Sequence, residues 1–253
     1  HREVMVKAAR AGKHIFTEKV MALTVDECKE IKAAIKKAGV KFCISFPHRT
    51  RPDILFAKKV LDDGLLGDIT LLRVRNAHNG SVADWLPEHF YNMEECGGGA
   101  MMDLGAHGMY LARWFLGKPA NIFSMFNNVT KREVEDNAVS VIEFKNKAIA
   151  INETGFVSTN DPFSFELNGT AGSLLIGGPD GGVKLNSTRI DSRISGWISP
   201  TDLPEPLPSA ITQWVNGIKN EAEIYFGLEE GIELTKLMEG AYYSYRNGKK
   251  VHL

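Results

Sequence analysis

An acid and an imidazole lie one helical turn apart in the segment GGGAMMDLGAHGMYLARWFLG, residues 97–117. Asp103 and His107 are separated by four positions, which places them on one face of a helix. Tyr110 and Trp114 continue that stripe, and we expect them to serve packing. A histidine beside a carboxylate is the arrangement of a general base and the group that orients it. The segment therefore predicts an acid–base site on an otherwise apolar, buried helix.

Glycines surround this pair of side chains. Gly97–Gly99 precede it, and Gly105 and Gly108 lie on either side of His107. A glycine inside a helix lowers helix stability by about 1 kcal/mol relative to alanine, so we expect the glycines at these positions to have a specific role. We interpret them as space through which a ligand approaches the imidazole. The alternative is a core histidine that Asp103 holds by a hydrogen bond, since structural pairs of this kind also occur.

Charged side chains follow two short apolar segments near the start of the chain. Glu18 and Lys19 come at the end of KHIFTE, and His48 and Arg49 follow VKFCISF. If both segments are parallel strands, these residues share the edge of the sheet where ligands bind in open α/β folds. The alternative is that they are solvated surface charges, which is the usual state of Lys and Arg.

Residues 1–66 alternate between helix and strand signals. Thr24 followed by Glu27 is a capping box that begins a helix, and Gly39 ends that helix. Pro52 lies in the first turn of a later helix that ends at Gly64. The alternation is typical of a parallel sheet with crossover helices. We predict helices at 1–11, 23–39 and 51–64, and strands at 13–18 and 40–46.

Residues 67–253 show strand signals in succession, joined by short turns that carry Gly, Asn or Asp. This pattern predicts an α+β domain with an open mixed or antiparallel sheet. The helices are too few to cover both faces of such a sheet, so we expect a homo-oligomer, a dimer or tetramer, built on the uncovered face. The expected strands are 68–80, 121–129, 137–144, 147–156, 163–169, 172–178 and 249–253; the expected helices are 97–117, 210–222 and 227–248, after a Pro-rich connector at 199–209.

Composition limits the kinds of partner. The 253 residues carry a formal net charge of −1 and no basic block, which argues against a nucleic-acid or membrane surface partner. No apolar run reaches the roughly 18 residues that cross a bilayer. Three widely spaced cysteines form neither a disulfide framework nor a metal motif. With no signal-peptide pattern at the start, we expect a cytoplasmic protein without a metal site.

Four segments, in the same order, resemble the Gfo/Idh/MocA oxidoreductases, the family of glucose–fructose oxidoreductase and inositol dehydrogenase. AGKHIFTEKVMALTVDE is similar to the family pattern AGKHV-x-x-EKP, and ISFPHRTRPD to G-F-x-x-R-x-x-P. The helical segment is similar to GGG-x-x-x-D-x-G-x-H-x-x-D, and EGAYYSYRNGKKVHL to the family's closing segment. The resemblance implies that residues 1–66 are the C-terminal half of a Rossmann domain, followed by the family's α+β domain.

The resemblance also implies an activity. Family members transfer a hydride between NAD or NADP and a sugar, cyclitol or related polyol. Carried over, Lys19 matches the catalytic lysine, Asp103 the acid and His107 the catalytic histidine, and all three would contact substrate. Glu18, Lys19 and Arg49 would lie toward the cofactor. In this hypothesis His107 exchanges a proton with the substrate hydroxyl, Asp103 orients His107, and Lys19 stabilises the alkoxide.

Three departures from the family pattern keep other readings open. Val20 replaces a proline and would hold Lys19 less firmly, and Tyr110 replaces an aspartate. The phosphate-binding G-x-G-x-x-G would precede His1, so we expect these residues alone not to bind NAD(P) with useful affinity. The alternatives are a non-catalytic module of the same fold that senses a nucleotide or sugar, and an inactive fragment.

Overall fold

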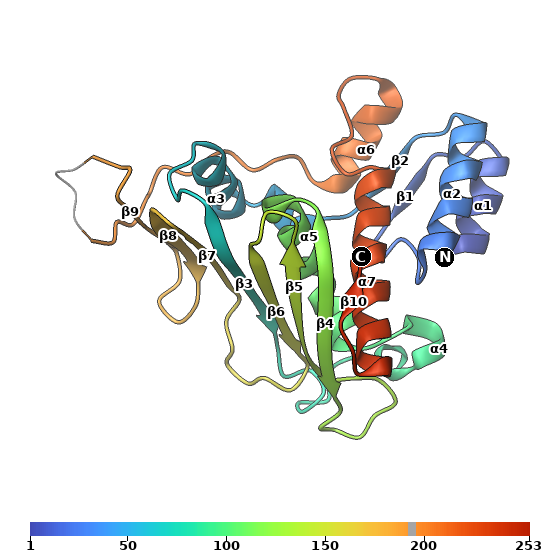
Figure 1. Cartoon of the computed structure of the whole chain (residues 1–253). Helices are drawn as coiled ribbons and strands as arrows, with labels where there is room; N and C mark the ends of the chain where they lie inside the picture. Colours follow the sequence, from blue (N-terminus) through green and yellow to red (C-terminus); the bar gives the residue numbers. More distant parts are fainter. Residues whose placement is uncertain (192–195) are drawn as a thin grey trace.

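Two β-sheets organise the chain in the computed structural model, which describes residues 1–191 and 196–253 (Figure 1). A two-stranded parallel sheet carries the helices of the N-terminal part, and an eight-stranded mixed sheet carries the rest. The fold class predicted from the sequence is confirmed. The division after residue 66 stays a prediction.

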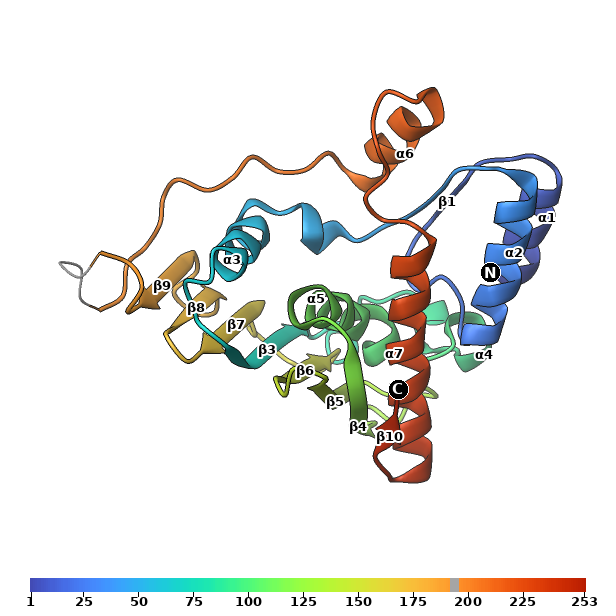
Figure 2. The ribbon, with the colours of Figure 1, turned by 45° about the horizontal axis from the view of Figure 1, so that its top comes forward.

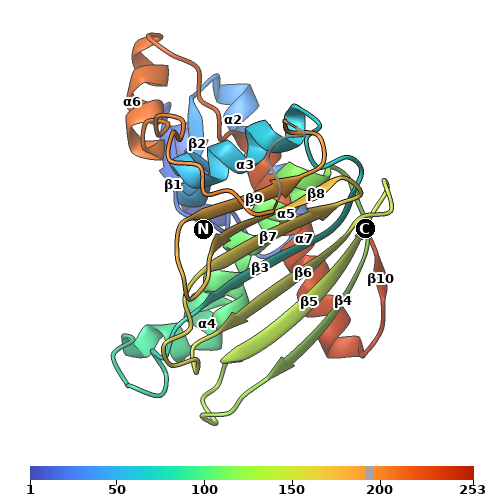
Figure 3. The same cartoon turned by 90° about the vertical axis from the view of Figure 1, so that its left-hand side faces the viewer.

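The small sheet pairs β1 (Ile15–Thr17) with β2 (Phe42–Ile44). Helices α1 (Arg2–Arg10) and α2 (Val25–Ala38) lie on one side of it and α6 (Ala210–Lys219) on the other (Figures 1 and 3). The predicted capping box begins α2, because the Thr24 side chain accepts from the Glu27 backbone N–H while the Glu27 carboxylate accepts from the Thr24 N–H. Helix α6 arrives from far along the sequence, and its Trp214 contacts Phe16 with the ring centroids 6.0 Å apart.

The large sheet has the strand order β10-β4-β5-β6-β3-β7-β8-β9, and β3 with β6 is its one parallel pair among the described strands. Helices α5 (Ala106–Leu116) and α7 (Leu228–Asn247) cover one face, and α3 (Pro52–Asp62) lies near β8 (Figures 2 and 3). The remaining elements are η1 (Pro47–Thr50), β3 (Ile69–Ala77), η2 (Glu88–Tyr91), α4 (Met93–Cys96), η3 (Met101–Gly105), β4 (Pro119–Asn127), β5 (Asn137–Phe144), β6 (Ile149–Gly155), β7 (Ser164–Gly169), β8 (Gly172–Gly177), β9 (Val183–Ser187) and β10 (Val251–His252).

The predicted elements are found with small shifts at their ends, and two differences matter. Strand β9 is absent from the sequence prediction, because its alternation is short and lies among turn residues. The helix expected at 97–117 is not continuous: a π-helical turn at Met101–Gly105 precedes the α-helix Ala106–Leu116. The spacing of side chains on this segment therefore differs from that of a regular α-helix.

The helix glycines serve packing, so the interpretation of Gly105 and Gly108 as space for a ligand is wrong. A Cβ atom at Gly108 would overlap the amide of Asn152 on β6, and one at Gly105 would overlap Met101. Asn152 also donates to the Gly105 carbonyl oxygen over 2.8 Å. The small residues let the helix lie directly on the sheet.

The face of the large sheet opposite α5 and α7 exposes apolar side chains, namely Phe123, Met125, Val139, Val141 and Ile149. In the part of the chain that the structure describes, every helix is too short or too polar to cross a bilayer. An exposed apolar face on a wide sheet is typical of an interface between protein molecules.

We predict that a second copy of the chain covers this face. Replacing Met125 and Val141 with Lys places two charges in the contact and should shift the sedimentation profile from an oligomer to a monomer at tens of micromolar. Replacing Val4 on α1, which is about as exposed as Met125, with Lys is the control and should leave the sedimentation profile unchanged. A wild-type protein that sediments as a monomer at this concentration contradicts the prediction.

Candidate active site

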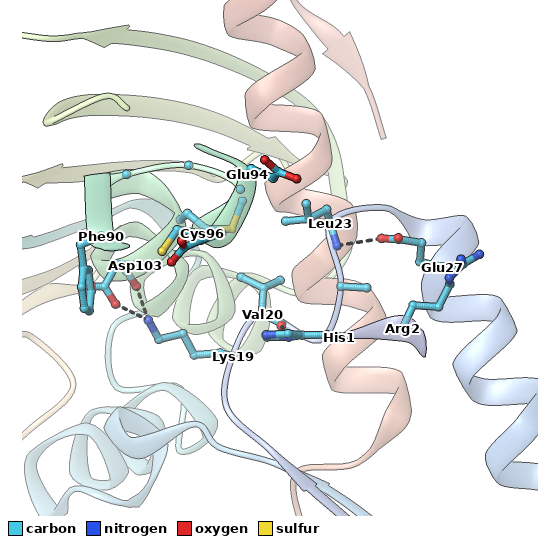
Figure 4. Close-up of a pocket in the computed structure, with 16 residues that line it drawn as sticks. His1, Arg2, Lys19, Val20, Leu23, Glu27, Phe90, Glu94, Cys96 and Asp103 are labelled. Carbon is cyan, nitrogen blue, oxygen red and sulfur yellow. Dashed lines mark hydrogen bonds and ion pairs between the residues drawn. The ribbon is translucent and has the colours of Figure 1, made fainter. Parts of the chain in front are cut away.

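Lys19 and Asp103 form the polar centre of the site. Lys19 follows β1, and its Nζ donates to Asp103 Oδ1 and to the Asp103 carbonyl oxygen, over 2.6 Å in each case (Figure 4). The lysine side chain is 12% exposed and the aspartate 29%. The Lys19–Val20 peptide bond is cis. The structure thus joins two residues that are 84 positions apart in sequence, as the predicted site requires.

The partner of His107 is not the one expected. Its Nδ1 lies 2.9 Å from the hydroxyl of Tyr110, whereas Asp103 bonds to Lys19. The role of Asp103 as the group that orients His107 is therefore wrong, because the π turn between them breaks the regular i, i+4 spacing. The assignment of Tyr110 to packing alone is also wrong, since its hydroxyl contacts the imidazole.

His48, on η1, contacts both Tyr110 and His107. Its backbone N–H donates to the Tyr110 hydroxyl over 3.1 Å, and its ring lies 4.6 Å from the His107 ring, centroid to centroid. Burial lowers the pKa of His48 to about 4, with a further contribution from the Arg51 cation. Burial, followed by the Lys19 cation, lowers the pKa of His107 well below its ordinary value. Both imidazoles are neutral at pH 7.

Glu18 and Arg49, both predicted to bind the cofactor, differ in their surroundings. Glu18 is exposed at the end of β1, beside Lys19. The Arg49 guanidinium lies 4.4 Å from the centre of the Trp114 ring and 5.0 Å from that of Phe226. Its Nε is buried and has no hydrogen-bond partner among residues 1–191 and 196–253. Glu18 therefore lies beside the Lys19–Asp103 pair, as expected. The Arg49 guanidinium instead lies in an aromatic cluster that holds η1 against α5.

A cavity of about 310 Å³ adjoins the Lys19–Asp103 pair. The stretch Gly97–Gly99 lines it together with Glu94 and Glu95, of which Glu94 is labelled in Figure 4. Within residues 1–191 and 196–253 no group of His, Cys, Asp and Glu side chains is arranged to hold a metal ion. The cavity therefore offers a lysine cation and several oxygen acceptors to a small polar ligand.

Glu135 holds the glycine stretch from behind, and sequence reasoning missed it. Its Oε1 accepts from the backbone N–H groups of Gly99 and Met101, over 2.9 and 3.0 Å, and from the Tyr242 hydroxyl over 2.6 Å. A Cβ at Gly98 would overlap that hydroxyl. In the sequence Glu135 stands in the polar stretch KREVED, where nothing distinguishes it from its exposed neighbour Glu133.

Comparison with known proteins defines the class. The model for an oxidoreductase family with an NAD-binding Rossmann fold matches residues 1–46, and the Gfo/Idh/MocA C-terminal domain model matches residues 54–175. The fold is that of a Rossmann-type oxidoreductase. The chain belongs to the Gfo/Idh/MocA family.

Two of the curated relatives are named dehydrogenases. The chain is 26% identical over 206 residues to levoglucosan dehydrogenase of Pseudarthrobacter phenanthrenivorans, covering 69% of this chain and 52% of that protein. It is 30% identical to D-glucoside 3-dehydrogenase of Escherichia coli, covering 62% of this chain and 49% of that protein. The chain thus spans about half the length of these curated relatives.

Solved structures share the whole fold. Aldose-aldose oxidoreductase from Caulobacter crescentus, in complex with glycerol, matches with a TM-score of 0.83 at 25% identity, over 100% of this chain and 76% of that chain. Levoglucosan dehydrogenase in complex with NADH and levoglucosan matches with a TM-score of 0.88 at 20% identity, over 100% and 77%. The second likeness, at this identity, shows the fold alone.

Proposed function

We propose that the protein is an oxidoreductase that transfers a hydride between NAD or NADP and one carbon of a sugar, cyclitol or related polyol. The observation that carries the proposal is the Lys19–Asp103 pair at the wall of a cavity, with the neutral His107 close enough for the Lys19 charge to lower its pKa. The family membership supports it, as do the names of the relatives.

The residues present fit the nicotinamide end of the cofactor. Lys19 and Glu18 lie at the carboxyl edge of the small parallel sheet, which is where dinucleotides bind in this class of fold. When bound, the nicotinamide supplies or accepts the hydride. Among the described residues we find no glycine-rich turn between a strand and a helix that would hold the pyrophosphate. We propose contacts from Glu18 and Lys19, with Arg49 acting through the position of η1.

The reacting oxygen of the substrate would lie between Lys19 and His107. Lys19 donates to it and stabilises negative charge there, in a partly buried place where such charge counts for more than in water. Asp103 holds the ammonium in position, and its carboxylate would also accept from a neighbouring hydroxyl of the substrate. The carboxylates of Glu94 and Glu95 provide further acceptors, which suits a ligand rich in hydroxyl groups.

The test is reduction of NAD⁺ and NADP⁺, followed by absorbance, by the full-length protein with a panel of aldoses, glycosides, anhydrosugars and inositols. We expect turnover with at least one of them and about 10²-fold lower turnover in His107→Ala, which loses a group at the reacting oxygen. The control His89→Ala removes an exposed imidazole on η2 and should keep full turnover. Unchanged turnover in His107→Ala contradicts the assignment.

A further inference from the structure

The Tyr110 hydroxyl has two polar neighbours among the described residues. It accepts from the His48 backbone N–H over 3.1 Å and lies 2.9 Å from His107 Nδ1. The side chain is 3% exposed, and its ring stacks on Phe46 with the centroids 4.3 Å apart. Both the ring and the oxygen of Tyr110 are therefore fixed.

Only one direction of the Tyr110–His107 hydrogen bond leaves every donor and acceptor of the three groups paired. A phenol carries one proton to donate, and the His48 N–H already donates to its oxygen. If Tyr110 also accepted from His107, its own proton would be buried with no acceptor in the described chain, an arrangement that folded proteins avoid. If Tyr110 donates to Nδ1, all three groups are satisfied. Burial also raises the pKa of Tyr110, so the hydroxyl keeps its proton.

We propose that Tyr110 fixes the tautomer of His107 in which Nδ1 accepts a hydrogen bond and Nε2 carries the proton. His107 then presents a donor to the substrate, because a neutral imidazole has one N–H and one acceptor nitrogen. Its Nε2 makes no hydrogen bond within the described residues, which leaves it free for a bound oxygen. Tyr110 is a positioning residue in this account, since it acts through the imidazole.

This tautomer bears on the form of the substrate, a step that rests on the proposed function. In the proposed site Lys19 and His107 would both donate to the reacting oxygen, which gives it two donors. A carbonyl oxygen accepts from both, whereas a hydroxyl that did so would still need an acceptor for its own proton. The resting site is thus matched to the carbonyl form of the substrate. In its reduction the hydride would reach the carbon from a reduced nicotinamide, and Lys19 would give a proton to the oxygen and become a neutral amine. His107 stabilises the charge that forms on the oxygen, as a neutral imidazole can.

The test reads the two ring nitrogens directly. Nitrogen-15 is introduced into the histidines, and long-range proton–nitrogen spectra are recorded for the wild type, with His107→Gln used to assign the His107 signals. We expect a protonated Nε2 and an Nδ1 resonance displaced by hydrogen bonding. In Tyr110→Phe, which keeps the ring on Phe46, the Nδ1 resonance should move to the value of a nitrogen that accepts no bond.

Tyr242→Phe is the matched control, because it removes another buried hydroxyl that contacts Glu135 and not His107. It should leave the His107 signals unchanged. A protonated Nδ1 in the wild type overturns the proposal, as does an Nδ1 resonance that is the same in Tyr110→Phe. The wild-type spectrum decides even if Tyr110→Phe does not fold. None of these readings requires turnover, so failure of the proposed function is detected separately, by the substrate panel.

Discussion

Lys19→Ala lowers turnover by about 10²-fold or more in the full-length protein, the usual scale for a group that stabilises charge or moves a proton at the reacting atom. The Lys19 ammonium is the cation that Asp103 fixes at the cavity, through two hydrogen bonds of 2.6 Å. Its removal takes the charge from the reacting oxygen and leaves the half-buried Asp103 carboxylate without its partner. Steady-state rates with the substrate found in the panel measure the effect.

Lys29→Ala is the matched control for this variant. Lys29 also forms an ion pair, with Asp26 over 2.7 Å, but its side chain is 68% exposed on α2. Exposed pairs contribute little, so both stability and turnover should stay at the wild-type level. If Lys19→Ala turned over as fast as Lys29→Ala, Lys19 would have no part in the chemistry.

Glu135→Ala should cost about 3 kcal/mol or more of the free energy of unfolding, the largest stability effect that we expect from a polar residue. It removes the acceptor of three buried donors, and each such loss costs about 1–3 kcal/mol. Urea unfolding of the variant measures the loss. Glu133→Ala, at an exposed position two residues earlier, is the control and should stay within about 0.5 kcal/mol of the wild type.

The Glu135 carboxyl should also make stability depend on pH, in a definite direction. Burial raises the pKa of Glu135 above its ordinary value of 4.5, against the opposing effect of the Tyr242 hydroxyl. The native state therefore holds this proton more tightly than the unfolded state. The stabilisation is complete below about pH 4.5 and is lost as the pH rises through the folded pKa.

Glu135→Gln isolates this effect, because an amide carbonyl accepts the same hydrogen bonds and does not ionise. The difference in unfolding free energy, wild type minus Glu135→Gln, should fall as the pH is raised above 4.5. A difference that rises over this range would mean that the carboxylate is the form the fold prefers.

Local sequence determined most of the elements. The capping box at Thr24, the proline in the first turn of α3 and the alternation along β4 and β5 each act over a few residues, so they can be read without knowing the fold. The same holds for the placement of Lys19 at the end of a strand and of Asp103 on the glycine-flanked helix. These residue types and positions, together with the family resemblance, predicted the site in outline.

The tertiary structure decided how the site is connected. The i, i+4 spacing paired Asp103 with His107, but a π turn changes the helix geometry and Lys19, from the small sheet, binds Asp103 instead. The Tyr110 hydroxyl contacts His107 on the same helix and also accepts from the His48 N–H, which η1 brings to it from a distant part of the sequence. The helix glycines owe their presence to the surface of β6, which the sequence of the helix does not contain.

Glu135 illustrates the same limit most clearly. Its sequence neighbours are ordinary loop residues, and its role depends on donors from the glycine stretch and from α7, which lie 34 to 107 positions away. Short-range patterns report the energy of a turn or a helix end, which depends on adjacent residues. A buried hydrogen-bond acceptor is chosen by whichever donors the folded chain brings to it, and only the packing of distant elements determines those.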